Sequence, residues 1–145
     1  TFLENVVFLG IFVLNVLTSM RVSFILIFLF FSFGLMAQDT WVAPASSKDV
    51  VNVYSENNIA TQKGEKLYSK LCWTCHGKTG QGDGPAGKSL KPKPRNFSLD
   101  EVQAQTDGEL FWKLSEGNGM MIPYKHSLSE DQRWQLINYI RTFKK

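Results

Sequence analysis

Apolar residues are crowded into the first quarter of the chain, and further along they recur at helical spacings. Between Thr1 and Ala37 the only charged side chains are Glu4 and Arg21, and two nearly continuous apolar stretches fill the rest of this segment. Beyond Ala37 the sequence becomes polar, with apolar positions three and four residues apart in three places. Because that spacing aligns side chains along one face of a helix, the pattern predicts three helices.

The three predicted helices have recognisable ends. The first begins at Thr61 and leads into Cys75, and its apolar face consists of Gly64, Leu67, Tyr68, Leu71 and Cys72. Thr106 or Asp107 can cap a shorter second helix, which ends at the glycines at positions 117 and 119. Ser129 opens the third with the S-x-x-Q spacing of a capping box. The sequence therefore predicts an all-α fold, with a domain over residues 61–145.

Two segments between these elements lack a sustained period. Residues 38–60 contain only a brief alternation of apolar residues, which is too weak to predict a strand, and this segment is interpreted as a linker or a wrapped arm. The segment from Gly77 to Ser98 contains five glycines and three prolines, which disfavour long regular structure. It is expected to be a loop that wraps around a neighbouring group.

The apolar start of the chain has the features of an export signal. Met20-Arg21 gives a short positive region, and an apolar run follows it and ends at Ala37, which predicts a signal peptide that starts at Met20 and is cleaved after Ala37. Residues 1–19 are then an upstream extension. The alternative is an uncleaved membrane anchor, since the two apolar stretches together exceed the roughly 20 residues that a span needs. Arg21 would then lie near the middle of the membrane, which is costly. Both interpretations place the polar part outside the cytoplasm.

The charge balance restricts the classes of partner. The 145 residues include 16 Lys and Arg against 13 Asp and Glu, a net charge of +3, and the basic residues are spread along the chain. So small a surplus argues against a polybasic protein that binds nucleic acid. It is compatible with mild electrostatic steering of a partner.

The motif Cys72-Trp73-Thr74-Cys75-His76 is the strongest chemical signal in the sequence. In a C-x-x-C-H segment the two thiols add to the vinyl groups of a haem, and the histidine binds the iron. The competing interpretations are a redox dithiol, a structural disulfide and half of a zinc site. A thioredoxin-like dithiol needs a βαβ setting, which is absent from the pattern. A zinc site needs four ligands, and beyond the two cysteines only His76 and His126 remain as nitrogen donors.

An electron carrier with a low-spin haem needs a sixth iron ligand. After the predicted signal the candidates are Met120, Met121 and His126. A thioether favours ferrous iron and so raises the reduction potential relative to a second imidazole. The two methionines lie between glycines and Pro123, where the backbone can approach a ligand closely. Gap-filling in a core is the alternative role for such a pair.

Several of these features together resemble the small class I c-type cytochromes, over about residues 61–145. The features are the C-x-x-C-H motif, the Gly/Pro loop after it, the Met-x-Pro-Tyr segment and the closing helix with Leu136 and Tyr139. The resemblance implies the small cytochrome c fold, with three main helices and loops wrapped around one covalently attached haem c, which carries the iron. In that family an aromatic residue usually follows the ligand methionine by three, which fits Tyr124 and favours Met121 over Met120. The pair Met-Pro, common in the family, is interrupted here by Ile122.

The resemblance also implies roles for residues away from the iron. Pro85 would accept a hydrogen bond from the ring N–H of His76 on its backbone carbonyl, which would fix the ring and strengthen its donation to the iron. The helix with Gly64 and Tyr68 would cross the last helix near Leu136 and Tyr139.

Charged and aromatic residues outside these motifs have two possible roles each. Arg95 could pair with a haem propionate, and Lys91 and Lys93 could steer an acidic partner toward the haem edge; all three could equally be charges of a solvated loop. His126 is expected at the surface. Aromatic residues that are expected to pack in the core or against the haem are Trp73, Trp112 and Trp134.

The function predicted from these residues is electron transfer by a single haem, with iron held by His76 and Met121, in the periplasm. No acid, base or nucleophile set stands out, so the chain is not expected to be an enzyme. By resemblance, its partners would be a membrane cytochrome complex or dehydrogenase as donor and a terminal oxidase or reductase as acceptor, and the N-terminus could anchor it to the membrane. Two alternatives remain: a tethered electron-transfer subunit of a larger oxidoreductase, and a haem-based sensor or peroxidase in which Met121 dissociates.

Overall fold

The chain divides into two compact units, residues 1–40 and residues 41–145, and the computed structural model describes the second. The predicted signal peptide or membrane anchor lies outside the described residues. Within residues 41–145, no helix combines the length and the apolar character that a membrane crossing requires.

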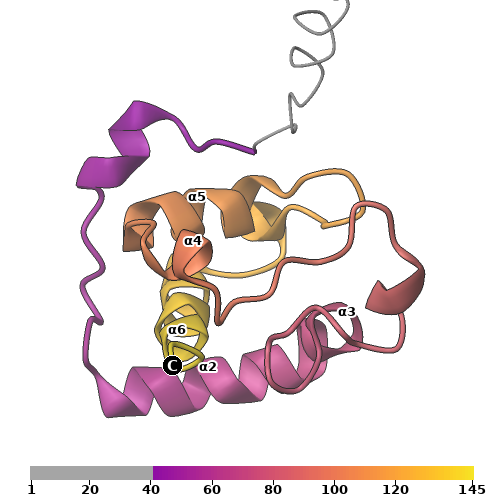
Figure 1. Ribbon diagram of the computed structural model, residues 1–145. Coiled ribbons are helices and arrows are strands. Elements are labelled where there is room, and N and C mark those ends of the chain that lie inside the picture. The colour runs from indigo at the N-terminus through magenta and orange to yellow at the C-terminus, as the bar shows by residue number, and fades with distance from the viewer. Residues whose placement is uncertain (1–40) are drawn as a thin grey trace, which may run out of the picture. The chain divides into compact units, whose positions relative to one another are not determined.

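In the described part of the chain, the regular secondary structure consists of helices joined by loops, apart from one isolated bridge between Asn118 and Met121 (Figure 1). The main helices are α2 (Asn58–Leu71), α5 (Asp107–Glu116) and α6 (Glu130–Arg141). The shorter segments are η1 (Ala45–Asp49), α3 (Trp73–His76), η2 (Gly87–Ser89), α4 (Asp100–Gln103) and η3 (Tyr124–His126). The prediction of an all-α fold with three main helices is confirmed.

The helix ends follow from local capping. Thr106 and Ser129 both form complete capping boxes, so α5 and α6 begin where the sequence predicted. Helix α5 stops at Gly117, whose φ of 66° lies in the left-handed region. Helix α2 begins three residues before the predicted Thr61, because the side chain of Asn57 accepts a hydrogen bond from the Ala60 amide at 3.0 Å.

Helices α2 and α6 pack against each other at the centre of the domain. A Cβ atom at Gly64 would lie 1.9 Å from the carbonyl oxygen of Gln135, so only glycine permits this approach. Next to this contact the rings of Tyr68 and Tyr139 lie 5.2 Å apart, and Leu136 is completely buried. The predicted crossing of the first and last helices is confirmed.

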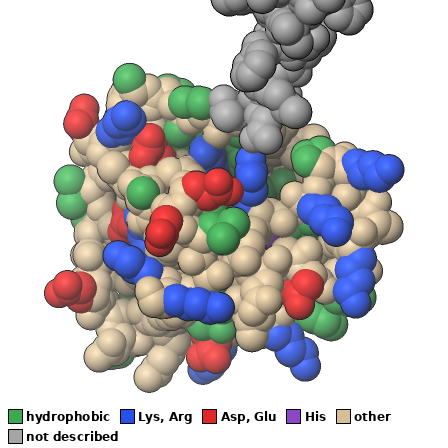
Figure 2. All heavy atoms as spheres, in the orientation of Figure 1, with side chains coloured by type: hydrophobic (Ala, Val, Ile, Leu, Met, Phe, Trp, Pro, Cys, Tyr) green, Lys and Arg blue, Asp and Glu red, His purple; other side chains and the backbone are tan. Residues whose placement is uncertain are grey.

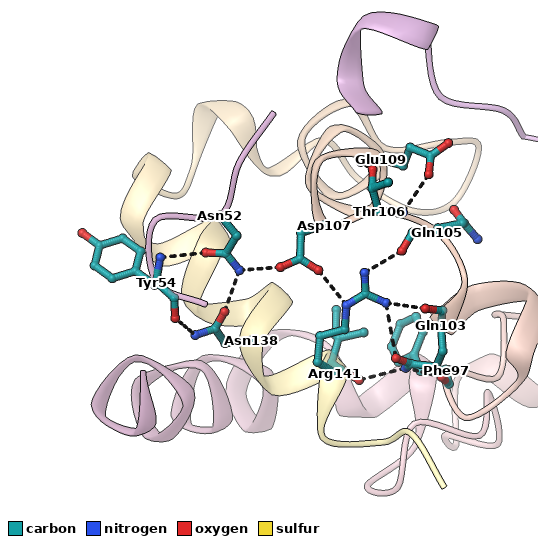
Figure 3. Close-up of polar contacts among 11 residues, drawn as sticks. Asn52, Tyr54, Phe97, Gln103, Gln105, Thr106, Asp107, Glu109, Asn138 and Arg141 are labelled. Carbon is teal, nitrogen blue, oxygen red and sulfur yellow. Dashed lines mark hydrogen bonds and ion pairs between the residues drawn. The ribbon is translucent and has the colours of Figure 1, made fainter. Parts of the chain in front are cut away.

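Residues 41–57 form an arm that packs on α5 and α6, rather than a free linker. Asn52 is buried, and its Nδ2 atom donates to Asp107 Oδ2 and to Asn138 Oδ1, both at 2.7 Å (Figure 3). Asn138 in turn donates to the backbone carbonyl of Tyr54. Helix α5 has no side chain at Gly108, where a Cβ atom would lie 2.0 Å from the Ser47 carbonyl oxygen of the arm. The described residues of this segment therefore lie against the helical domain.

Candidate haem-attachment site

The C-x-x-C-H motif forms one tight turn that continues the direction of α2. The amide of Cys72 donates to the Tyr68 carbonyl, and the amide of His76 donates to the Cys72 carbonyl, each at 2.9 Å. Both thiols are free and half-buried. Burial, with Cys75 close by, raises the pKa of the Cys72 thiol to about 12. The turn therefore holds two free thiols and an imidazole within five consecutive residues.

The glycine-rich loop after the motif folds back onto the backbone of α3. A Cβ atom at Gly84 would lie 2.4 Å from the Thr74 carbonyl oxygen, and one at Gly87 would lie 2.1 Å from that of Cys75. The Tyr68 hydroxyl fixes the start of the loop by donating to the Gly77 carbonyl at 2.7 Å. These glycines are therefore needed for close packing of the loop around the motif.

The imidazole of His76 stacks on the ring of Phe97, with 4.5 Å between ring centroids and 15° between planes. Its Nδ1 atom is buried and has no hydrogen-bond partner. Burial lowers the pKa of His76, and an interaction with the backbone of Arg95 opposes that shift. The ring is thus held as a neutral base, which is the form that binds a metal ion.

The hydrogen bond expected between His76 and the Pro85 carbonyl is absent from the structure. The amides on either side of Pro85 are bonded to α3 instead: Gly84 donates to Cys75 and Ala86 donates to Thr74. Within residues 41–145, no group accepts a hydrogen bond from His76 Nδ1.

The two methionines lie in a short closed loop between α5 and η3, here called the methionine loop (residues 117–123). Asn118 and Met121 exchange two backbone hydrogen bonds, of 2.9 and 3.0 Å, which close the loop. Gly117 has room for no Cβ atom, because one would lie 2.3 Å from the Met121 carbonyl oxygen. Met120 is 74% exposed, whereas Met121 is half-buried and packs against the hydrophobic core. Of the two methionines, Met121 is therefore the one that packs against the core.

Tyr124 connects the methionine loop with the motif. Its side chain is buried, and its hydroxyl donates to the backbone carbonyl of Leu71 at 3.2 Å. Burial raises the pKa of this phenol to about 12, and the neighbouring Cys72 and Cys75 contribute to the same shift. The sequence indicated Tyr124 only by its distance from Met121, and the structure adds this bridging role.

The remaining candidate residues are placed as follows. Arg95 pairs with Glu101 at 3.1 Å, and since both side chains are more than half exposed this pair contributes little to stability. Lys91, Lys93 and His126 are exposed. Trp134 is buried and stacks on Phe111, and Trp73 packs against the core, as expected. Trp112 lies outside the core cluster and contacts Trp41.

The residues of this region fit a covalently attached haem. Two free thiols, a buried imidazole with an unsatisfied nitrogen and an inward thioether are the donors that such a group requires. Within the described part of the chain, no group of three or more His, Cys, Asp or Glu side chains could hold a metal ion.

Comparison with known proteins decides the family. Residues 59–140, more than half of the chain, match the family described as cytochrome c oxidase, cbb3-type, subunit III. The chain belongs to this family. It is a c-type cytochrome with the small class I fold, and its cofactor is one covalently bound haem c.

Individual relatives of this cytochrome agree with the assignment. It is 31% identical over 91 residues to Cytochrome c-L of Methylorubrum extorquens, and this match covers 62% of the chain and 43% of the relative. The chain thus spans less than half the length of that curated protein. The crystal structure of cytochrome cL from Hyphomicrobium denitrificans is similar with a TM-score of 0.51 and 28% identity, over 71% of this chain and 64% of the other.

A second structural relative belongs to a larger assembly. A chain of the reducing HAO-like protein complex of Kuenenia stuttgartiensis is similar with a TM-score of 0.55 and 27% identity. The match covers 61% of this cytochrome and 45% of that chain. The two cytochrome cL relatives agree with the assignment of this chain to the c-type cytochromes.

Proposed function

We propose that this cytochrome is a single-haem electron carrier whose iron is held by His76 and Met121, and that it works in an exported electron-transfer chain. The observation that carries the proposal is the contrast between the two methionines. Met121 packs against the core at the end of the loop that Tyr124 ties to the motif, and Met120 points into solvent. Met121 is therefore the ligand favoured over Met120.

The protein's own groups have distinct parts in this function. Cys72 and Cys75 would hold the haem through thioether bonds, and the haem supplies the one-electron chemistry. The stack of Phe97 on His76 limits rotation of the imidazole, and the closed methionine loop limits movement of Met121. A ligand set that stays in place on oxidation and reduction requires little rearrangement, which favours fast electron transfer. If His76 and Met121 both bind the iron, they would leave it no position for a substrate, so the proposed function is not an enzymatic one.

An exported location follows from the haem attachment and from the start of the chain. Attachment of haem c takes place outside the cytoplasm, and the apolar segment before residue 38 has the features of a signal peptide or an anchor. We assign the cytochrome domain to the periplasm on these grounds.

The glycine-rich loop supports binding of an acidic redox partner. Residues 77–98 hold five basic residues and one acidic residue, Asp83, so this segment is more positive than the chain as a whole. Figure 2 shows mostly Lys and Arg among the charged side chains on the side where Figure 1 draws α3 and this loop. Such an arrangement raises the rate of encounter with an acidic surface, as a membrane cytochrome complex, a dehydrogenase or a terminal oxidase would present.

A second candidate function is that of a tethered subunit in a larger oxidoreductase. The docked arm favours this candidate. Residues 41–57 lie outside the family match and are fixed to the domain, so they could attach the domain to a larger assembly. Copurification of the native protein with a catalytic chain would support this candidate.

Absorption spectra of the exported, haem-loaded protein test the proposal. The oxidised wild type should show the near-infrared sulfur-to-iron band, Met121→Ala should lose it, and Met120→Ala should keep it. Absence of covalent haem would overturn the whole proposal. Loss of the band only in Met120→Ala would overturn the choice of ligand, and rapid binding of carbon monoxide by the reduced wild type would favour a sensor or a peroxidase.

A further inference from the structure

Two arginines of helix α6 bind the two ends of helix α5. At the N-terminal end, Arg141 Nε donates to Asp107 Oδ1 at 2.7 Å, and the same guanidinium donates to the carbonyl oxygens of Gln103 and Gln105 (Figure 3). At the C-terminal end, Arg133 Nη1 donates to the hydroxyl of Ser115. The methionine loop begins two residues after Ser115.

Arg133 makes two contacts with α5, one with the Phe111 ring and one with the Ser115 hydroxyl. Its guanidinium carbon lies 4.5 Å from the centroid of the Phe111 ring, and that ring stacks on Trp134 at 3.9 Å. Ser115, which receives the hydrogen bond from Arg133, donates in turn to the Phe111 carbonyl at 2.7 Å. The cation, the hydroxyl and the two aromatic rings therefore form one connected cluster at the end of the helix.

Not every N–H group of the Arg133 guanidinium has a hydrogen-bond partner. Arg133 Nε is buried without a hydrogen-bond partner, one of two such side-chain atoms among residues 41–145. An unpaired buried N–H costs free energy, so a residue kept there is expected to have a role beyond its own contacts. The cluster leads directly into Gly117, whose backbone lies against Met121.

We propose that Arg133 is a positioning residue for Met121: by holding Ser115 and Phe111, it sets the point from which the methionine loop leaves α5. The loop is short and closed by the Asn118–Met121 bridge, so a shift of its first residue moves the thioether with it. Arg141 stabilises the same helix at the end far from the loop. The inference rests on the proposed ligand Met121.

Competition by imidazole, which can replace a weakly held sixth ligand, tests the role. The fraction of molecules in which Met121 has left the iron sets the apparent affinity for imidazole. In the haem-loaded protein, Arg133→Gln should bind imidazole about tenfold more tightly than wild type, the factor expected when one charged hydrogen bond is lost. Ser115→Ala should shift the affinity in the same direction.

Arg141→Gln is the matched control, since it removes the arginine contacts at the other end of α5. It should lower the midpoint of denaturant unfolding and leave the imidazole affinity within about twofold of wild type. Equal shifts in Arg133→Gln and Arg141→Gln would overturn the proposal, as would no shift in Arg133→Gln. If Arg133→Gln does not fold, Ser115→Ala decides by the same criterion. Met121→Ala distinguishes a failure of the role proposed for Arg133 from a failure of the proposed ligand. Unchanged imidazole affinity in Met121→Ala would refute Met121 as the ligand.

Discussion

The phenol of Tyr124 donates a hydrogen bond to the backbone carbonyl of Leu71, with 3.2 Å between the two oxygens. Leu71 immediately precedes the first cysteine of the motif, and Tyr124 follows Met121 by three residues. This contact joins the two parts of the site that lie farthest apart along the chain. It also gives the buried phenol a partner, without which its burial would be unfavourable.

Replacement of this phenol should weaken the link without dismantling the domain. Tyr124→Phe should lower the free energy of unfolding by about 1 kcal/mol, the usual contribution of one such hydrogen bond. Denaturant unfolding followed by circular dichroism measures the change. Tyr139→Phe is the control, because no hydrogen bond of that hydroxyl exists among residues 41–145. Equal losses in the two variants would show that the hydroxyl of Tyr124 has no specific role.

The crossing of α2 and α6 should not tolerate a side chain at Gly64. A Cβ atom there would lie 1.9 Å from the Gln135 carbonyl oxygen, which is backbone and cannot turn aside. Gly64→Ala should therefore destabilise the domain by about 3 kcal/mol, the upper range for an overpacked core. The measurement is the shift in thermal unfolding temperature of the haem-loaded protein.

Gly119→Ala provides the comparison for that substitution. A Cβ atom at Gly119 meets nothing within 4 Å, and only its φ of 56° opposes a side chain. The expected cost is about 1 kcal/mol, from backbone strain alone. A smaller loss for Gly64→Ala than for Gly119→Ala would contradict the close crossing.

The arm should contribute to the stability of the cytochrome domain. Asn52→Ala removes the donor to Asp107 and to Asn138 and leaves these two polar groups without that partner, at an expected cost of about 2 kcal/mol. A chain that begins at residue 61 should lose at least as much. Val53→Ala, at a neighbouring position that is 75% exposed, should change the free energy of unfolding little. An unaltered unfolding midpoint in Asn52→Ala would show that the arm is not a stable part of the fold.

Reversal of charge on the glycine-rich loop should change the rate of electron transfer. The double variant Lys91→Glu/Lys93→Glu should slow oxidation by an anionic small-molecule oxidant several-fold at low ionic strength, and high salt should remove the difference. Stopped-flow kinetics over a range of salt concentrations measure both effects. The variant Lys63→Glu/Lys66→Glu changes the net charge equally on α2, where both side chains are exposed. A similar slowing in both would place the effect in the total charge rather than in the loop.

Most of the helical framework could be predicted because its signals are local. The cap at Thr106 or Asp107 and the capping box at Ser129 indicated where α5 and α6 begin. The resemblance to the class I cytochromes indicated that α2 crosses α6 at Gly64 and Tyr68. The short helix α4 was not predicted, since four residues are too few for a period to show.

Long-range contacts made by loops could not be predicted from local sequence signals. The hydrogen bond expected between His76 and the Pro85 carbonyl is not formed, and the segment around Pro85 packs on α3 through Gly84 and Gly87. The docking of the arm through Asn52 was likewise invisible, since its partners lie 55 and 86 residues away.

The sequence by itself determined the class of this protein: the C-x-x-C-H motif, the methionine pair and the three amphipathic helices depend on residues close together in the chain. The tertiary structure alone showed how far each methionine is buried, how Tyr124 reaches Leu71 and how Arg133 meets Ser115. These relationships depend on burial and on the way α5 and α6 pack. Both arise only when segments that are distant in the sequence pack together in one hydrophobic core.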